Sequence, residues 1–367
     1  MLTIAFAGGG TGGHIYPGLA VASRVKEKTP CRIFWIGAAY GMDRSIVEGA
    51  GLEFYGIPAG KLRRNFSFKN FGDAFRVIAG FFAAKKILKK EKPLLLFSKG
   101  GFVSVPPCAA AAALGITVIT HESDFSPGLA TRLNARFACK GKGRIITAYE
   151  KTASYFPRRR REKITALGNP VRPEFRGADP AKGRAFLGVG ETERILLVLG
   201  GSQGARELNE LVYASLDALT VPYVVVHQTG AGNNGEALSR AARYKGRYKP
   251  FAYINEEMPC VLAAAELVAG RSGAGTVWEC AAAGKAMVLA PLTGSGTRGD
   301  QSENARCFAG LGAALVLESG ESGAFTALIL SLAGDEAKRN AMSAAAFRIG
   351  ERDARVLIAD AILEAAL

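Results

Sequence analysis

Two small-residue stretches in this chain have the composition and spacing to bind phosphate groups. Gly8, Gly10 and Gly13 fit the pattern G-x-G-x-x-G between an apolar run and a helical pattern, which is typical of a loop that cradles a phosphate or diphosphate. Residues 271–279 (RSGAGTVWE) follow the apolar run 267–270 and precede an alanine-rich run that predicts a helix over 277–283. Free N–H groups and the helix dipole at such a helix start favour an anion. Glu279, one turn further in, could reach the hydroxyls of a sugar joined to that anion, although a plain helix cap with a surface glutamate would look the same.

His14 ends the first glycine loop and is the candidate general base. The chain has only 3 histidines, and an imidazole presented by a ligand-binding loop could take a proton from an attacking hydroxyl near neutral pH. The alternative is a structural histidine that only forms hydrogen bonds. The next predicted strand, 32–36, ends in Gly37-Ala38-Ala39 and not in the acidic residue that a dinucleotide site requires, so NAD is not expected.

Further polar groups follow predicted strands, where an open α/β sheet binds its ligands. Lys99, Gly100 and Gly101 come after the apolar run 94–98 and could bind another phosphate, although a tight turn with an incidental lysine would have the same sequence. The stretch 121–124 (HESD) follows the strand predicted over 116–120. These groups are therefore expected in the ligand crevice.

Two more stretches could contact a sugar nucleotide. Gln301 and Asn304 lie three residues apart at a predicted helix start, and their amides suit sugar hydroxyls, although many helices begin with polar residues. Arg172 stands between Pro170 and Pro173 in a stiff predicted linker, from which it could reach a diphosphate.

Residues 61–92 suggest a membrane contact, because they combine ten basic residues with an aromatic face and contain only two acidic residues. Phe71, Phe75, Ile78 and Phe82 recur at helical spacing, and Lys85, Lys86 and Lys89 follow them. Basic residues beside an aromatic face suit an anionic lipid surface. The alternatives are an amphipathic helix packed on its own sheet and, with less support because no motif accompanies the charge, a nucleic-acid contact.

The elements that must position these residues alternate between strands and helices, which predicts parallel α/β sheets. The pattern runs over the first half of the chain and restarts near residue 195. Helices are predicted over 17–28 and 107–114, and a terminal helix over 353–367. The predicted strands are 2–7, 32–36, 52–57, 94–98, 116–120 and 143–147, then 195–199, 222–227, 249–254, 266–270, 286–290 and 313–317. We expect domains at 1–168 and 169–345, with residues 346–367 forming a terminal helix that could pack across the junction between them.

Composition narrows the class of protein. The 367 residues carry 47 Lys+Arg against 32 Asp+Glu, and this net charge of +15 points to a polyanionic partner. The six cysteines are scattered without C-x-x-C spacing, which argues against disulfides and a zinc site. No run approaches the roughly 18 apolar residues of a spanning helix, and the N-terminal strand lacks the features of a signal peptide, so a cytoplasmic location is expected.

As an ordered set, these motifs resemble the MurG family of N-acetylglucosaminyltransferases, over residues 4 to about 317. The motifs are 9–14 (GGTGGH), 99–104 (KGGFVS), 121–122 (HE), 168–172 (GNPVR), 200–206 (GGSQGAR), 271–274 (RSGA) with Glu279, and 301–305 (QSENA). The resemblance implies a GT-B fold, in which two Rossmann-like α/β domains with parallel sheets face across a cleft. It also implies inverting transfer of GlcNAc from UDP-GlcNAc to the C4 hydroxyl of undecaprenyl-diphospho-MurNAc-pentapeptide, which converts lipid I to lipid II in peptidoglycan synthesis.

The resemblance further implies roles for single residues. Ile254 would contact uracil, Glu279 the ribose, Ser202 and the turn 273–276 the diphosphate, and Gln301 the GlcNAc. The implied UDP-GlcNAc set is Thr11, Gly12, Gly13, Asp124, Arg172, Ser202, Ile254, Arg271, Gly273, Ala274, Gly275, Thr276, Val277, Trp278, Glu279, Gln301 and Asn304. The implied acceptor diphosphate set is Gly12, Gly13, Lys99, Gly100 and Gly101.

The implied mechanism is a single displacement in which His14, or in second place Glu122, deprotonates the acceptor hydroxyl. No metal or cofactor is expected, since no acidic D-x-D cluster follows a predicted strand. The partners would be UDP-GlcNAc, lipid I and an anionic inner-leaflet surface, for a peripheral protein on the cytoplasmic face of the inner membrane. The alternatives are another GT-B glycolipid glycosyltransferase, a UDP-sugar epimerase, or a non-catalytic basic membrane-binding protein.

Three positions depart from the family pattern. The family commonly has asparagine at the position of Asp124, a small polar residue at that of Lys99 and a larger side chain at that of Gly275. An ionised carboxylate at 124 can only accept hydrogen bonds, so this side chain would not take a donor role.

Overall fold

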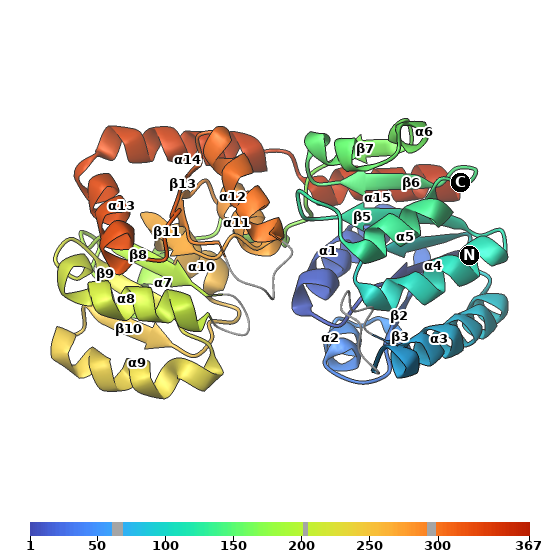
Figure 1. Cartoon of the computed structure of the whole chain (residues 1–367), viewed down its shortest axis with the longest axis horizontal. Helices are drawn as coiled ribbons and strands as arrows, with labels where there is room; N and C mark the ends of the chain where they lie inside the picture. The colour runs from blue at the N-terminus through green and yellow to red at the C-terminus, as the bar shows by residue number, and fades with distance from the viewer. Residues whose placement is uncertain (61–68, 201–204, 292–298) are drawn as a thin grey trace. The chain divides into compact units, whose positions relative to one another are not determined.

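The chain forms two α/β units, which Figure 1 shows in a computed structural model. The structure describes residues 1–60, 69–200, 205–291 and 299–367, with side chains except at 69–72 and 74. Unit 1 comprises Met1–Val171 and Asp353–Leu367, and unit 2 comprises Arg172–Arg352. The chain therefore leaves unit 1 once and returns to it for its last segment. Within the described ranges, no helix has both the length and the apolar character that crossing a bilayer requires.

Unit 1 is built on a seven-stranded parallel sheet in the order β3-β2-β1-β4-β5-β6-β7. Its strands are β1 (Leu2–Ala7), β2 (Cys31–Ala38), β3 (Glu53–Ile57), β4 (Leu95–Ser98), β5 (Thr117–Glu122), β6 (Arg144–Thr147) and β7 (Ile164–Ala166). Its α-helices are α1 (Gly12–Lys28), α2 (Asp43–Gly49), α3 (Lys69–Glu91), α4 (Val105–Ala113), α5 (Leu129–Ala138), α6 (Arg158–Arg161) and α15 (Ala354–Ala366). The strand order reverses between β1 and β4, where Ala7 lies opposite Ser98.

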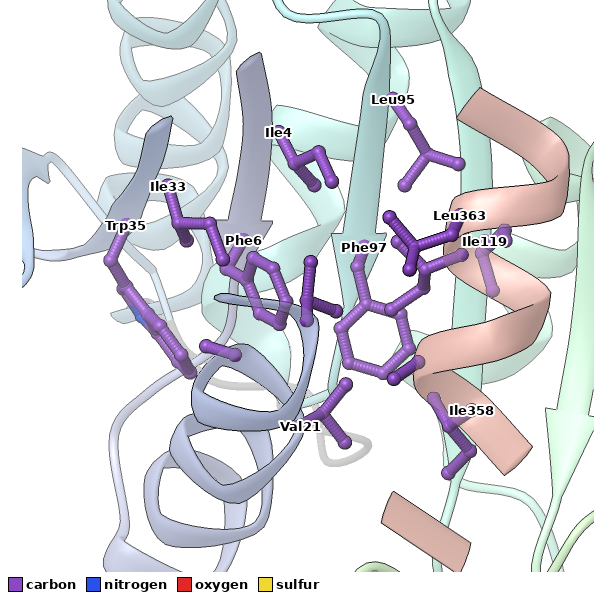
Figure 2. Packing of buried hydrophobic residues seen from close by; sticks show 14 of the residues in the cluster. Ile4, Phe6, Val21, Ile33, Trp35, Leu95, Phe97, Ile119, Ile358 and Leu363 are labelled. Carbon is purple, nitrogen blue, oxygen red and sulfur yellow. The ribbon is translucent and has the colours of Figure 1, made fainter. Parts of the chain in front are cut away.

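Alternation along the strands gives the sheet of unit 1 two buried faces. Ile4 and Phe6 of β1 join Phe97 in a cluster with residues of α1 and α15. Figure 2 shows Ile358 and Leu363 of α15 beside Phe97 in this cluster. Ala5 and Ala7 point to the other face, which α3, α4 and α5 cover through buried residues such as Ala84, Leu88, Cys108, Ala110 and Ala135. The C-terminal helix is thus part of the core of unit 1.

Unit 2 repeats the design with a six-stranded parallel sheet in the order β10-β9-β8-β11-β12-β13. Its strands are β8 (Ile195–Leu199), β9 (Val224–Gln228), β10 (Tyr248–Phe251), β11 (Leu267–Gly270), β12 (Ala286–Leu289) and β13 (Ala314–Val316). Its α-helices are α7 (Pro180–Leu187), α8 (Arg206–Leu219), α9 (Asn234–Ala241), α10 (Met258–Ala264), α11 (Ala274–Ala282), α12 (Asp300–Gly310), α13 (Ser322–Gly334) and α14 (Glu336–Gly350). Here the order reverses between β8 and β11, where Leu199 lies opposite Gly270.

The α/β fold class with two parallel sheets is confirmed, and several element boundaries differ from the expectation. Helix α1 begins at Gly12 and not near Pro17, which lies buried inside the helix. Helix α11 begins at Ala274, so three residues expected in a turn form its first turn. Strand β5 extends to Glu122, and the short strand β7 was not foreseen. The small residues 274–276 suggested a turn, but they fit the first turn of a helix, whose N–H groups need no partner within the helix. Pro17 is the sixth residue of α1, and its missing N–H leaves the carbonyl of Gly13 without its usual helical partner.

Candidate active site

The glycine loop after β1 is held in place by Asp43, a residue that the sequence analysis did not identify. Asp43 is buried at the start of α2, and its carboxylate accepts hydrogen bonds from the backbone N–H of Gly10, at 2.9 and 3.2 Å, and of Ala38, at 2.9 Å. A β-carbon at Gly9 would lie 1.8 Å from Asp43 Oδ2, so only glycine fits there. Strand β2 does not end in an acidic residue. Asp43 stands five residues beyond the strand instead, and its carboxylate organises the glycine loop.

His14 lies in the first turn of α1 and packs against the loop that follows β4. Gly101 has φ +75°, and a β-carbon there would lie 2.9 Å from His14 Cδ2 and 3.0 Å from the carbonyl oxygen of Gly9. Gly100, with φ +89°, also borders the imidazole, because its β-carbon would come within 4.0 Å of His14 Nδ1. The structure therefore brings together His14, the first glycine loop and Gly100–Gly101, at the point where the strand order reverses. That point is where open α/β sheets bind ligands.

A buried hydrogen-bond network fixes the backbone of the loop after β4, and it too was not foreseen. Asn134 of α5 donates through Nδ2 to Ser98 Oγ at 3.1 Å and to Ser104 Oγ at 2.8 Å. Ser104 Oγ donates to the carbonyl of Gly101 at 2.8 Å, and the N–H of Gly100 donates to Ser98 Oγ at 3.2 Å. Because Ser98, Ser104 and Asn134 are almost fully buried, this network fixes the loop against which His14 packs.

Lys99 points into the protein. Its side chain is buried, and its ammonium group donates a hydrogen bond to the hydroxyl of Ser123. Burial lowers the pKa of Lys99 to about 8, while the negative charges of Glu122 and Asp124 act in the opposite direction. The ammonium group is thus bonded to a protein hydroxyl, and the contact between Lys99 and the acceptor diphosphate stays a prediction.

Glu122 and His121, at the end of β5, organise the backbone around them. The Glu122 carboxylate accepts hydrogen bonds from the N–H groups of Ser123 at 2.9 Å, Asp124 at 3.1 Å and Gly128 at 3.0 Å. His121 is buried, and its Nε2 lies 2.9 Å from the carbonyl oxygen of Gly168, to which it must donate. Burial holds the pKa of His121 well below its usual range, so this imidazole is neutral.

In unit 2 the corresponding position is the start of α11. The N–H of Arg271 donates to the carbonyl of Leu199 at 3.1 Å, which fixes the loop after β11 beside the end of β8. The helix begins after Gly273, whose carbonyl accepts from the N–H of Val277 at 3.2 Å. The N–H groups of residues 274–276 form its first turn, and such groups have no partner within their own helix. They provide a donor set for an anion at the positive end of the helix dipole.

Glu279 and Arg172 lie together next to this helix start. Glu279 Oε1 is 3.9 Å from an Arg172 guanidinium nitrogen, and about a third of each side chain is exposed. The Arg172 guanidinium also stacks over Phe175, 4.8 Å from the ring centroid. Burial raises the pKa of Glu279 to about 7, with Arg172 acting in the opposite direction. Glu279 is therefore a carboxyl group that changes its charge near neutral pH.

Hydrogen bonds tie α12 to the loop that precedes α11. Asn304 is buried and donates through Nδ2 to the carbonyl of Ser272 at 3.1 Å, while Ser272 Oγ donates to the carbonyl of Gln301 at 2.8 Å. Asn304 thus positions the loop, and the half-buried Gln301 stands three residues earlier, in the first turn of α12.

Several expected donor residues are enclosed by the protein. Trp278 and Val277 are buried, and the Trp278 ring meets Phe308 edge-on at 5.9 Å. The guanidinium of Arg271, 9% exposed, pairs with Glu207 at 2.9 Å. Ile254 is buried, and its N–H donates to Gln228 Oε1 at 3.0 Å. These buried residues support the candidate site from inside unit 2. Ser202 lies outside the described residues.

Comparisons with known proteins agree with this architecture. Residues 4–141 match the model of the glycosyltransferase family 28 N-terminal domain, and residues 195–358 match that of the glycosyltransferase family 28 C-terminal domain. A UDP-N-acetylglucosamine–N-acetylmuramyl-(pentapeptide) pyrophosphoryl-undecaprenol N-acetylglucosamine transferase of Treponema denticola is 48% identical, over 97% of this chain and 96% of its own. The transferase of the same name from Treponema pallidum is 51% identical over 86% of this chain and 82% of its own.

Solved structures show the same likeness. The crystal structure of MurG from Acinetobacter baumannii superposes with a TM-score of 0.77 at 25% identity, covering 99% of this chain and 100% of that one. The Anabaena protein HepE in complex with UDP and glucose superposes with a TM-score of 0.66 at 16% identity, covering 99% of each chain, which shows a shared fold.

Proposed function

Because the chain belongs to the family of UDP-N-acetylglucosamine–N-acetylmuramyl-(pentapeptide) pyrophosphoryl-undecaprenol N-acetylglucosamine transferases, we propose that it catalyses the reaction that gives this family its name. It would move GlcNAc from UDP-GlcNAc to the C4 hydroxyl of the undecaprenyl-diphosphate-linked muropeptide, converting lipid I to lipid II for peptidoglycan. The observation that carries the proposal is 48% identity to the Treponema denticola transferase along almost the whole of both chains. The starts of α1 and α11 lie at the two strand-order reversals and suit phosphate groups, and this arrangement supports the proposal independently of the relatives.

Unit 2 would bind the donor nucleotide at the start of α11. The N–H groups of residues 274–276 and the helix dipole suit the diphosphate, and Arg172 and Gln301 add polar groups nearby. The carboxylate of Glu279 would accept hydrogen bonds from the ribose hydroxyls. We place Ile254 at the uracil and Ser202 at the diphosphate on the strength of the family resemblance. The remaining donor contacts proposed, Thr11–Gly13 and Asp124, belong to unit 1.

Unit 1 would bind the acceptor diphosphate and supply the base. The backbone of Gly12–Gly13 and of Gly100–Gly101 borders His14, which we propose as the group that takes the proton from the C4 hydroxyl. The hydroxyl oxygen then attacks the anomeric carbon of GlcNAc, and the bond from that carbon to the UDP oxygen breaks with inversion. Glu122 is the weaker candidate, because three backbone N–H groups already use its carboxylate. The helix start at α11 would stabilise the negative charge on the departing UDP.

Helix α3 would dock the enzyme on an anionic lipid surface. Phe75, Ile78 and Phe82 are 72%, 54% and 63% exposed, whereas Ala84 and Leu88 are buried against the sheet. These three residues of the predicted apolar face therefore do not pack into the core. Lys86 and Lys89 are exposed beside it, and Lys85 lies 5.8 Å from the Phe81 ring centroid. An exposed aromatic face with flanking lysines suits the interface of an anionic membrane. The side chain of Phe71 lies outside the described residues.

A transfer assay tests the proposed reaction. The purified protein is incubated with UDP-GlcNAc carrying a radiolabelled sugar, with either lipid-diphosphate-linked muropeptide or a muropeptide that lacks the lipid diphosphate. We expect label in the lipid product and free UDP only when the lipid-linked acceptor is present. Conversion of UDP-GlcNAc to another UDP-sugar without acceptor, or equal transfer to an unrelated glycolipid, would contradict the proposal.

A further inference from the structure

The first and last segments of unit 2 are joined by the side chain of Arg176. Its guanidinium group donates through Nη1 to the carbonyl of Glu351 and through Nη2 to the carbonyl of Arg352, each at 3.2 Å. Glu351 is the C-cap of α14, where carbonyl groups have no partner within the helix, and Arg352 follows it. A planar guanidinium can bond both carbonyls at once, and its positive charge suits the negative end of the helix dipole. Arg176 therefore holds the start of unit 2 on the end of α14.

The same end of α14 packs closely on α11, the helix at which we place the donor. Gly350 is buried, and a β-carbon there would lie 2.3 Å from the carbonyl carbon and 2.4 Å from the carbonyl oxygen of Ala281. Only glycine allows the two backbones to approach so closely. Ala281 lies two residues after Glu279 in α11. The end of α14 is therefore a support that α11 and Arg176 share.

Arg172 stands on the segment that Arg176 holds. The N–H of Phe175 donates to the carbonyl of Arg172 at 3.2 Å. The N–H of Arg176 donates to the carbonyl of Pro173 at 2.9 Å, which folds this segment into a tight 3₁₀ turn. Phe175 is 1% exposed and lies under the Arg172 guanidinium. The buried ring and the Arg176 guanidinium thus anchor the turn that presents Arg172 3.9 Å from Glu279.

We propose that Arg176 is a positioning residue of the donor site, which holds Arg172 beside Glu279 by clamping the first turn of unit 2 to the end of α14. The role of Glu279 as a donor contact rests on the proposed function, whereas the placement of Arg172 does not. Without the clamp, Arg172 would move away, and the Glu279 carboxyl group would lose the positive charge that favours its ionised form. Glu279 would then keep its proton to higher pH, and UDP-GlcNAc would bind more weakly at neutral pH.

A double-mutant cycle tests this arrangement in the whole chain. The variants are Arg176→Met, Arg172→Met and the two combined, and calorimetry gives their dissociation constants for UDP-GlcNAc at pH 7. We expect Arg176→Met to weaken binding by about tenfold, which corresponds to about 1.4 kcal/mol. In the Arg172→Met background the same change should have less than about a twofold effect, because the clamp acts through Arg172. Effects that simply multiply would overturn the proposal.

The titration of Glu279 in the ligand-free protein is a readout that a merely structural role would not move. The NMR shift of its carboxyl carbon, assigned by comparison with Glu279→Gln, gives the midpoint. We expect the midpoint to rise by at least about half a pH unit in Arg176→Met and in Arg172→Met, and no further in the double variant, since a nearby opposite charge lowers the pKa of an acid by about 1–3 units. An unchanged midpoint in Arg176→Met would overturn the proposal. If the proposed function failed instead, the wild type would not bind UDP-GlcNAc, while the midpoint would still shift.

The matched control is Arg247→Met. Arg247 also donates to two successive carbonyls at the end of a helix, those of Thr220 at 2.5 Å and Val221 at 3.3 Å after α8. These residues precede β9, at the opposite end of the parallel sheet from the start of α11. The control should lower stability in urea as Arg176→Met does, yet leave donor affinity within about twofold and the Glu279 midpoint unchanged. Equal changes in the control would overturn the proposal.

Arg176→Lys keeps the test decisive if Arg176→Met does not accumulate as folded protein. Lysine keeps the charge and loses the fork that bonds two carbonyls, so donor binding should weaken by at least about threefold. That loss should again disappear in the Arg172→Met background. Unchanged donor affinity in Arg176→Lys, or a loss that persists without Arg172, would overturn the clamp.

Discussion

The carboxylate of Glu279 lies 3.9 Å from the guanidinium of Arg172, the first residue of unit 2. The pair stands next to the start of α11, where we place the donor nucleotide. Since burial raises the pKa of Glu279 to about 7, its charge depends on pH in the range in which the enzyme would work. Donor binding and stability should respond to that charge in opposite directions.

Donor affinity should increase as pH rises through about 7, because the ionised Glu279 carboxylate is the better acceptor for the ribose hydroxyls. Glu279→Gln should weaken UDP-GlcNAc binding by about tenfold or more above pH 8, since a hydrogen bond to a charged group contributes about 1.5–3 kcal/mol. Calorimetric titrations of both proteins at pH 6, 7 and 8 measure this. If donor affinity still changed with pH in the Glu279→Gln protein, the change would have to come from another titrating group.

Stability should change the other way in the same variant. The folded-state pKa of Glu279 lies above its ordinary value of 4.5, so the folded protein holds this proton more tightly than the unfolded chain does. Its contribution to stability is therefore lost as pH rises from about 4.5 through about 7. Glutamine cannot ionise, so Glu279→Gln should gain about 1–2 kcal/mol relative to wild type above pH 8, a value reduced from the full shift because the side chain is partly solvated. Urea unfolding at pH 5 and pH 8 checks this, and an equal difference at both pH values would refute it.

Replacing His14 should remove the base and leave donor binding intact. We expect His14→Ala to lower kcat by about 10²–10⁴-fold, the usual contribution of a positioned base. Because His14 lies in unit 1 and the nucleotide is placed on unit 2, the dissociation constant for UDP-GlcNAc should change less than about threefold. Single-turnover rates with saturating substrates, together with a donor titration, separate the two effects. Near-native turnover in His14→Ala would show that another group acts as the general base.

Gly101 should be required for activity in a way that a glycine with a similar φ is not. Gly101 and Gly115 have φ values of +75° and +74°, but a β-carbon at Gly101 would lie 2.9 Å from His14 Cδ2 and 3.0 Å from the Gly9 carbonyl. At Gly115, no described atom lies within 4 Å of that position. Both alanine variants should lose about 1–3 kcal/mol of stability because both positions have a positive φ, with Gly101→Ala at the upper end since its ψ of 157° lies in a region that is essentially restricted to glycine. Only Gly101→Ala should also lose activity, by about 100-fold, because displacing the base by 1 Å has that effect. Comparable activity in the two variants would show that the position of His14 does not depend on Gly101.

Helix α3 should control binding to anionic vesicles. Lys86→Glu combined with Lys89→Glu should weaken partitioning by at least about 30-fold, since each basic residue near the surface contributes about 1 kcal/mol. Phe75→Ser combined with Phe82→Ser should weaken it as well, by removing the aromatic contact. The matched control is Lys182→Glu with Lys338→Glu, two exposed lysines of unit 2. Sedimentation with vesicles of a phosphatidylglycerol mixture measures each variant, and an equal loss in the control would show only a general effect of net charge.

The sequence predicted the two parallel sheets and the small-residue turns well because their signals are local, whereas α1 and α11 begin several residues earlier than expected. The glycine loop before His14 and the small residues before Glu279 follow apolar strands, and both lie where each strand order reverses. Residues that act across long sequence separations could not be found in this way. Asp43 supports Gly10 across 33 positions, and Asn134 supports Ser104 across 30, although neither belongs to a recognisable motif.

The direction in which a side chain points could not be predicted from the sequence either. Lys99 looks like a phosphate ligand in a glycine-rich turn, yet its ammonium group meets Ser123 inside the protein. Asn304 looks like a sugar contact at a helix start, yet it bonds to the carbonyl of Ser272. Residue type and spacing indicate which chemistry is present near a site, whereas the three-dimensional packing decides which groups remain available to a ligand.

The return of residues 353–367 to unit 1 determines the order in which the protein can mature on the ribosome. All of unit 2 is synthesised before helix α15, whose Ile358 and Ile362 are fully buried in the cluster that contains Ile4 and Phe97. The sheet face around Phe97 therefore stays uncovered until α15 has been synthesised, whereas unit 2 is already complete and able to fold. During translation, unit 1 begins before unit 2 but can complete its core only after unit 2 has been made.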